Sequence, residues 1–189
     1  SVYRELMVSP FNTRRKFFAL IDSEISAAKA KKKAKITIKL NNLVDPKMIK
    51  KLYDASKAGV EIKLIIRGIC SLVPGVKNQS ENIEVISIVD RFLEHVRLFI
   101  FHNNNEPLYF ISSADWMERN LDKRIEVTAP IYDKNNQAVI QKMIDIQLAD
   151  NQKARIIDDR QSNRYVKSRK DPVRSQLETY AYFKGLLKK

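Results

Sequence analysis

The sequence predicts an α/β domain in which a mixed, mainly parallel sheet is flanked by helices on both faces. Segments rich in branched apolar residues alternate with segments of helical periodicity. One strand–helix–strand unit covers residues 36–66, which implies parallel pairing through a right-handed crossover. Two later β-type runs, at residues 96–101 and 108–111, are separated by a short Asn-rich stretch that indicates a hairpin. The chain has 189 residues, which is enough for one domain with a sizeable core.

Helix and strand signals follow one another clearly in the first third of the chain. Phe17 and Ile21 recur at helical spacing, so the first helix has an apolar face. Asp45 and Pro46 are typical of a helix start, and Gly59 is typical of a helix end. The expected elements are a helix from Pro10 to about Lys31, a strand at 36–40, a helix from Asp45 to Gly59 and a strand at 60–66.

The remaining two thirds contain more strands and two more helices. A loop at residues 70–82 holds Pro74 and Gly75, and a strand at 83–89 leads toward the hairpin. A strand at 126–131 and a helix at 135–148 follow the hairpin. We expect a final helix at 173–187 whose inner face is formed by Val173, Leu177, Tyr180 and Phe183.

Two segments carry no clear periodicity. Residues 1–8 do not begin with Met and are interpreted as a cut edge or a linker. Residues 150–172 are polar, and their basic side chains outnumber their acidic ones. They predict a basic loop across the surface of the domain.

Composition restricts the class of protein. The formal net charge of +13 favours anionic partners such as nucleic acid, a membrane surface or a polyanionic substrate. Apolar runs are too short to span a membrane, and no secretory signal is visible. The single cysteine, Cys70, cannot form an internal disulfide, which fits a reducing, cytoplasmic location.

Candidate binding residues gather at the ends of the predicted strands. Asn41 and Arg67 follow two adjacent parallel strands, so they share the edge at which open α/β sheets bind ligands. His95 precedes the first strand of the hairpin, between Arg91 and Arg97. Guanidinium and imidazole groups hold phosphate oxygens, although either arginine could instead pair with Asp90 or Glu94.

Small hydroxyl residues follow the second strand of the hairpin. Ser113 and Asp115 could contact phosphate, or they could only turn the chain. His95-x-Arg97, followed by Ser112-Ser113-Ala114-Asp115 and then Glu126, resembles the second histidine motif of the phospholipase D superfamily. That motif is His-x-Lys, a downstream Asp, Gly-Ser-x-Asn and a final acidic residue. Here arginine replaces the lysine, and His102 stands where the Asp would fall.

Six longer strings resemble a narrower family. In chain order they are LMVSPFNTRR, KLNNLVDPKMIKKLY, IIRGICSLVPG, SIVDRFLEH, SSADWMERNLDKRIEV and SNRYV. Together they are similar to the C-terminal domain of bacterial polyphosphate kinases, from about Leu6 to the end of the chain.

The resemblance implies a phospholipase D-like fold and a reversible transfer of the terminal phosphate of ATP to inorganic polyphosphate. It implies that residues 1–189 are a single C-terminal catalytic domain, in which His95 is the second active-site histidine and binds nucleotide together with Arg67. Candidate phosphate contacts are Arg91, Arg97, Ser113 and Asn41.

Other parts of the enzyme are implied to lie outside this chain. One is the preceding domain, which carries the phosphohistidine. The ligands of Mg²⁺ also lie outside this chain, so no metal site is expected here. ATP, ADP and polyphosphate are the implied partners, and we expect a homo-oligomer at full length. The full enzyme is expected to be cytoplasmic, and its association with a membrane stays open.

Two other functions stay open at this point. A stand-alone phospholipase D-like phosphodiesterase or nuclease would need to pair with itself, and its motif would be altered at Arg97 and His102. A basic nucleic-acid-binding module is the other, but the sequence has no recognition-helix or RNP-type pattern that would favour a specific nucleic acid.

Overall fold

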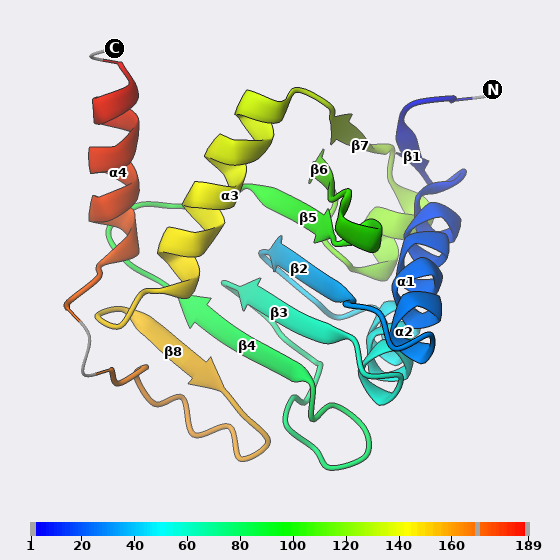
Figure 1. Cartoon of the computed structure of the whole chain (residues 1–189), viewed down its shortest axis with the longest axis horizontal. Helices are drawn as coiled ribbons and strands as arrows, with labels where there is room; N and C mark the ends of the chain where they lie inside the picture. The colour runs from blue at the N-terminus through cyan, green and yellow to red at the C-terminus, as the bar shows by residue number, and fades with distance from the viewer. Residues whose placement is uncertain (1–2, 169–170, 188–189) are drawn as a thin grey trace.

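Eight strands form one sheet within the residues that this computed structural model describes, 3–168 and 171–187 (Figure 1). Their spatial order is β1-β7-β6-β5-β2-β3-β4-β8. The strands are β1 (Met7–Ser9), β2 (Lys35–Leu40), β3 (Glu61–Ile66), β4 (Ile83–Ile88), β5 (Arg97–Phe101), β6 (Leu108–Ser112), β7 (Glu126–Ile131) and β8 (Ala154–Ile157).

The pairing confirms a mixed α/β sheet but not a mainly parallel one. Strand β3 pairs in parallel with both β2 and β4. The other five neighbouring pairs are antiparallel, so the expectation that parallel pairs would dominate is wrong. Three of the five pairs involve the short connection between β5 and β6 or the edge strands β1 and β8, and the other two, β2–β5 and β6–β7, lie on either side of the β5–β6 pair. A tight turn can join only antiparallel strands, whereas a parallel pair requires a long crossover.

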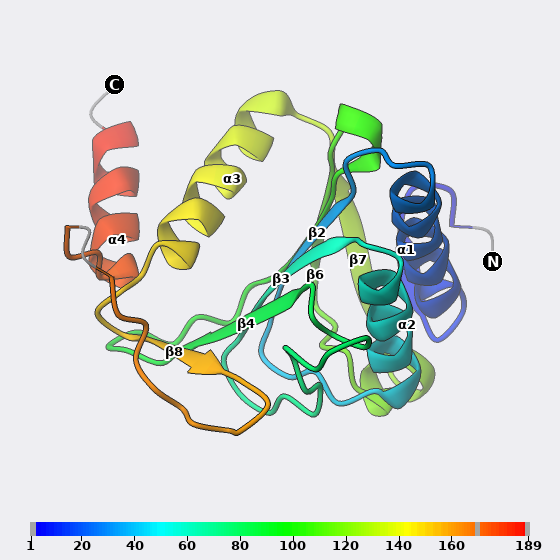
Figure 2. The ribbon, with the colours of Figure 1, turned by 60° about the horizontal axis from the view of Figure 1, so that its bottom comes forward.

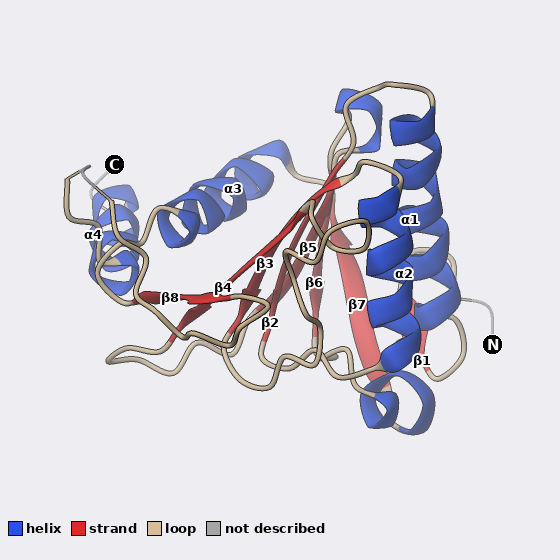
Figure 3. Cartoon of the chain, turned by 90° about the horizontal axis from the view of Figure 1, so that it is seen from below, coloured by secondary structure: helices blue, strands red, loops and turns tan. Residues whose placement is uncertain are grey.

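Helices cover both faces of the sheet, as predicted. Helices α1 (Thr13–Lys29) and α2 (Pro46–Lys57) lie on one face, and α3 (Lys134–Leu148) lies on the other (Figures 2 and 3). Helix α4 (Ser175–Leu186) stands beside α3 (Figure 1). Two short helical turns, η1 (Asn103–Asn105) and η2 (Arg119–Lys123), precede β6 and β7.

Each face has its own apolar core. On the side of α1 and α2, the ring of Phe17 lies 4.5 Å from that of Phe99 and 5.3 Å from that of Trp116, between ring centroids. All three side chains are fully buried. On the side of α3, Ile144 packs with Ile65 and Leu98. The sheet is therefore fixed from both sides, and its strand ends hold defined positions.

The start and end of α2 follow the signals in the sequence. The Asp45 carboxylate accepts a hydrogen bond from the Met48 backbone N–H at 2.9 Å, and Pro46 occupies the first turn. Gly59 follows the helix with a φ of +96°, a conformation that glycine adopts without a steric penalty.

Three expectations about the ends of the chain hold only in part, and residues 1–2 and 169–170 of the predicted end segments lie outside the described residues. Residues 7 and 8, expected within a cut edge or linker, belong to β1, which pairs with β7. The outward N–H of Val8 donates to the Asn12 side chain at 2.7 Å, and its carbonyl accepts from the Asn12 N–H at 3.0 Å. The Asn12 side chain and N–H thus satisfy the outer backbone groups of Val8. With three residues, β1 is too short for alternation of apolar and polar residues to predict it.

The predicted surface loop at 150–172 contains β8, which pairs with β4. On the outer side of β8, the Ile156 N–H donates to the Arg164 carbonyl at 2.8 Å, and the Val166 N–H donates to the Ala154 carbonyl at 2.9 Å. The predicted inner face of the last helix is largely exposed, at 42% for Leu177 and 63% for Tyr180. Beyond its first residues α4 contacts mainly α3, so most of its apolar side faces no core among the described residues.

The sheet reverses its order at β2, and this determines where a site can form. Strands β3 and β4 extend to one side of β2, and β5, β6 and β7 extend to the other. The carboxyl ends of β2, β3 and β6 consequently meet the amino ends of β5 and β7 at one edge. Ligands of open α/β sheets bind at such a reversal. Among the described residues, no helix is both long and apolar enough to cross a membrane.

Candidate functional site

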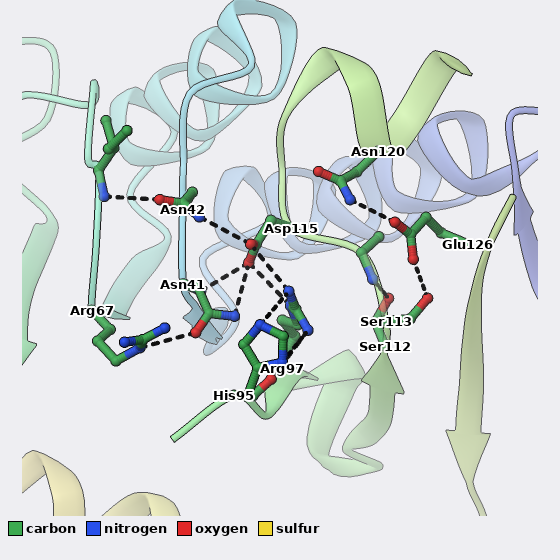
Figure 4. Close-up of polar contacts among 12 residues, drawn as sticks. Asn41, Asn42, Arg67, His95, Arg97, Ser112, Ser113, Asp115, Asn120 and Glu126 are labelled. Atoms are coloured by element: carbon green, nitrogen blue, oxygen red, sulfur yellow. Dashed lines mark hydrogen bonds and ion pairs between the residues drawn. The ribbon is translucent and has the colours of Figure 1, made fainter. Parts of the chain in front are cut away.

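The predicted site residues except Arg91 converge at the edge where the sheet reverses its order (Figure 4). Each follows or begins one of the strands that meet there. The residues are Asn41 and Asn42 after β2, Arg67 after β3, His95 and Arg97 at the start of β5, Ser112 and Ser113 at the end of β6, and Glu126 at the start of β7.

Asp115 is the centre of the hydrogen bonding at this edge. Its side chain is buried, with 4% of the residue exposed. Oδ1 accepts from the Asn41 backbone N–H at 2.8 Å and from Arg97 Nε at 3.2 Å. Oδ2 accepts from Asn42 Nδ2 at 3.1 Å and from Arg97 Nη2 at 3.3 Å.

These contacts hold the Asp115 carboxylate in its charged form. Burial by itself raises the pKa of Asp115, because a charge loses its hydration there. The hydrogen bonds from Arg97, Asn41 and Asn42 outweigh burial, so the pKa lies below its ordinary value of 3.8. A buried anion is thereby available to orient the basic groups around it.

The Arg97 guanidinium connects Asp115 to His95. While Nε and Nη2 bind the carboxylate, Nη1 donates to the His95 carbonyl at 3.2 Å. Nη1 and Nη2 also lie 3.4 Å and 3.2 Å from the ring nitrogens Nδ1 and Nε2. His95 is exposed, so its ring rests on a fixed guanidinium with its other side toward solvent.

Arg67 is joined to the same network through Asn41. Arg67 Nε donates to Asn41 Oδ1 at 3.1 Å, and Asn41 Nδ2 lies 3.4 Å from Asp115 Oδ1. Within the described ranges, no hydrogen bond occupies the terminal nitrogens of Arg67, whose side chain is half-buried. Gly68 comes next, and a Cβ there would lie 2.7 Å from Asn42 Oδ1 and 2.8 Å from the Asn41 carbonyl. Only glycine fits this close approach.

A buried lysine holds the segment before His95 from beneath. Lys39 of β2 is 3% exposed, and its Nζ donates to Glu94 Oε2 at 2.7 Å and to Gln147 Oε1 at 2.8 Å. Burial lowers the pKa of Lys39, the Glu94 carboxylate opposes this shift, and the charge of Arg67 adds to it. The net direction is downward.

Ser113 belongs to a neighbouring set of contacts. Its hydroxyl donates to the Glu126 carboxylate and accepts from the Val127 N–H at 3.1 Å. Glu126 also accepts from Asn120 Nδ2 at 2.6 Å. Ser113 is exposed and therefore reachable, although it lies outside the hydrogen bonds around Asp115.

Arg91 and His102 lie apart from these contacts. Arg91 is exposed, and its guanidinium carbon is 5.5 Å from the centre of the Phe92 ring. His102 follows β5, at the opposite end of that strand from His95.

The alternative pairing of Arg91 or Arg97 with Asp90 or Glu94 is not what forms. Arg97 binds Asp115, whereas Asp90 pairs with Arg174 and Glu94 with Lys39. Sequence reasoning had left Asp115 as either a phosphate contact or a turn residue, and it missed Lys39. The signal for Lys39 is a charged residue inside an otherwise apolar strand.

Comparison with known proteins identifies the family of this chain. Residues 6–176 match the family described as polyphosphate kinase C-terminal domain 2. The chain is 56% identical over 187 residues to polyphosphate kinase of Vibrio cholerae, covering 98% of this chain and 27% of that protein. With the Escherichia coli K12 polyphosphate kinase the identity is 48% over 182 residues, covering 96% of this chain and 26% of that protein. The chain thus spans about a quarter of the length of these relatives.

Solved structures agree. The crystal structure of polyphosphate kinase from Porphyromonas gingivalis matches with a TM-score of 0.94 and 44% identity, over 97% of this chain and 28% of that one. A phospholipase D family member, Nuc from Salmonella typhimurium, matches with a TM-score of 0.57 and 17% identity, over 82% of this chain and 97% of that one. The second match concerns the fold alone, and it confirms the phospholipase D-like architecture. The chain belongs to the polyphosphate kinase C-terminal domain family.

Proposed function

We propose that this chain is the part of a polyphosphate kinase that binds nucleotide phosphates and assists the reversible transfer of the terminal phosphate of ATP to inorganic polyphosphate. One observation carries the proposal beyond family membership. Arg67, Asn41, Asp115, Arg97 and His95 form a continuous hydrogen-bonded series at the reversal of the sheet. The two ends of that series are the two groups that solvent and ligand can reach.

Arg67 and His95 are the proposed ligand-binding groups. The unoccupied terminal nitrogens of Arg67 suit two phosphate oxygens, because a planar guanidinium donates in a fork. An exposed imidazole on a fixed support can donate a proton or a hydrogen bond as charge develops on the transferred phosphoryl group. His95 assists the transfer and does not itself carry a lasting phosphate.

The neighbours have different proposed roles. Asn41 and Arg97 are largely occupied by their contacts with Arg67, Asp115 and His95, which favours positioning over direct phosphate binding. Arg91 and Ser113 are exposed and remain proposed phosphate contacts. Phosphoryl transfer depends mainly on positioning and on cationic stabilisation, so such a division of labour is sufficient.

The rest of the reaction requires groups beyond this chain. We propose that a preceding domain of the same polypeptide provides the phosphohistidine, and that the full-length enzyme is a cytoplasmic homo-oligomer. The described residues contain no group of three or more His, Cys, Asp or Glu side chains that could hold a metal ion. We propose that Mg²⁺ is held elsewhere in the full enzyme.

Substitutions in the full-length enzyme test the proposal. We expect His95→Ala to lower kcat by roughly 10²- to 10⁴-fold, the range typical of a lost acid–base group. Arg67→Ala is expected to raise KM for ATP about tenfold, with poor rescue by Arg67→Lys, which lacks the planar fork. Arg15→Ala removes an exposed arginine of α1 and serves as the control. Unchanged kinetics for His95→Ala would overturn the proposal.

A further inference from the structure

The segment that carries His95 has little apolar packing of its own. Residues 89–96 connect β4 to β5 without regular structure. Three of their large apolar side chains are exposed, at 67% for Val89, 50% for Phe92 and 76% for Leu93, and only Val96 packs partly against the core on the α3 side. A connection of this kind needs other contacts if it is to hold one position.

The start of α4 provides such contacts. The Gln176 side chain is buried, at 4% exposed, and its amide pairs with the backbone of Phe92 at two points. Oε1 accepts from the Phe92 N–H at 2.7 Å, and Nε2 donates to the Phe92 carbonyl at 2.8 Å. The Gln176 amide thus forms the pair of hydrogen bonds that a neighbouring β-strand would form. Its partner, Phe92, lies three residues before His95.

A second contact joins Arg174, two residues before Gln176, to Asp90, two residues before Phe92. Arg174 donates from Nε and Nη2 to the two carboxylate oxygens of Asp90, at 2.8 Å and 2.7 Å. The start of α4 is itself anchored, because the Ser175 N–H donates to the buried Asp150 carboxylate at 2.7 Å. The segment 89–96 is therefore tied to a fixed point far away in the sequence.

We propose that Gln176 and Arg174 are positioning residues for His95. They hold segment 89–96 from the side of α4, while Lys39 holds Glu94 from within the sheet. The function that they serve rests on the role proposed above for His95. Their action is indirect, because neither residue is hydrogen bonded to His95 itself within the described part of the chain.

The test uses the full-length enzyme with Gln176→Ala and with Gln152→Ala, an exposed glutamine, as the matched control. Loss of two hydrogen bonds should speed amide exchange in the peptide containing Phe92 by about tenfold. A displaced catalytic group should lower kcat by roughly 10- to 100-fold, with KM for ATP changed less than about twofold. The control should match the parent in both measurements.

Two further variants separate positioning from folding. Gln176→Glu can accept from the Phe92 N–H but can donate to its carbonyl only when protonated. We expect its kcat, relative to the parent, to recover as pH falls. Asp90→Arg should lower kcat, and combining it with Arg174→Asp should restore much of the loss, because the pair is rebuilt in reverse.

The outcomes distinguish this inference from the proposed function. If His95→Ala lowers kcat and Gln176→Ala does not, the positioning role is wrong and the proposed function survives. If His95→Ala leaves kcat unchanged, both fail. A Gln176→Ala enzyme with unchanged exchange in the Phe92 peptide, or a Gln176→Glu enzyme whose relative kcat is flat with pH, would also overturn the inference.

Discussion

Asp115 shows how one buried residue determines the geometry of the site. Its carboxylate is the shared acceptor for the groups that hold both Arg67 and His95. We expect Asp115→Ala to destabilise the chain by about 3–5 kcal/mol, since a guanidinium and a backbone N–H lose their acceptor in a buried place. Urea unfolding measures this. Glu118→Ala removes an exposed carboxylate that pairs with Lys123 and should stay within about 0.5 kcal/mol of the parent.

The same carboxylate makes this stability dependent on pH. Its pKa in the folded chain lies below the ordinary value of 3.8, which approximates the unfolded chain. The unfolded state therefore takes up a proton first as pH falls, and the contribution of Asp115 is present above pH 3.8 and lost below it. The difference in unfolding free energy between the parent and Asp115→Asn should shrink as pH falls below 3.8. A difference that stays constant would contradict this assignment.

Gly68 is important because it has no side chain. Gly68→Ala places a Cβ 2.7 Å from Asn42 Oδ1 and 2.8 Å from the Asn41 carbonyl, so backbone must shift at a cost of about 1–3 kcal/mol. The shift moves Asn41, and we expect weaker nucleotide binding in the full enzyme as well. Gly185→Ala, inside α4 with nothing within 4 Å, is the control and should stabilise by about 0.5–1 kcal/mol. Equal effects of the two substitutions would refute the argument.

The sequence identified the charged ends of the site but not its centre. Arg67 and His95 stand out as basic residues at strand borders, and a strand–helix–strand unit predicts that strand ends meet at one edge. Asp115 has no such signal, because a carboxylate after Ser-Ser-Ala is equally typical of a turn. Its partners come from β2 and β5, and only the folded sheet brings them to it.

Among the elements, α2 is stabilised at its start by Asp45, which makes two kinds of contact. Asp45 caps the helix by accepting from the Met48 N–H, and it also binds both terminal nitrogens of Arg14 from α1, at 2.6 Å and 2.7 Å. Asp45→Asn should keep the cap but weaken the ion pair, whereas Asp45→Ala loses both. We expect the alanine variant to be less stable than the asparagine variant by about 1 kcal/mol, the usual value of a cap. Thermal unfolding of both variants measures the difference, and equal stabilities would mean that the cap contributes nothing.

Elements with strong local signals were predicted well, and those defined by distant partners were not. Helix α2 and the hairpin of β5 and β6 carry caps, breakers and alternation in their own residues. Strand β8 has four residues in a polar context, and its partner β4 lies far away in the sequence. The face of α4 was misjudged for a related reason. Periodicity shows that a helix has an apolar side but cannot show whether this chain covers it.

At the scale of the whole molecule, the chain spans about a quarter of the length of the polyphosphate kinases that it matches, and the function proposed above needs groups beyond it. The net charge of +13 suits a polyanionic substrate, and the exposed groups of the site lie at one edge of the sheet. We expect the isolated chain to make no polyphosphate from ATP and to take up no stable phosphate, because the phosphohistidine of the proposed mechanism lies outside it. Radiolabelled ATP followed by gel analysis measures both, with the full-length enzyme as the positive control. ATP-dependent chain growth by the isolated chain would contradict the proposed division of labour.

The outermost strands have a consequence for how the chain behaves among its own copies. A bare strand at the rim of a sheet invites a second polypeptide to extend the ladder, which is a common route to aggregation. Here the outward N–H and carbonyl of Val8 are both taken by Asn12, and β8 is covered by the hydrogen bonds of Arg164 and Val166. At both rims, edge groups that could pair with a second strand are thus already bonded within the same chain. These contacts disfavour strand addition at either end, so a larger assembly of such sheets is expected to join through faces and loops.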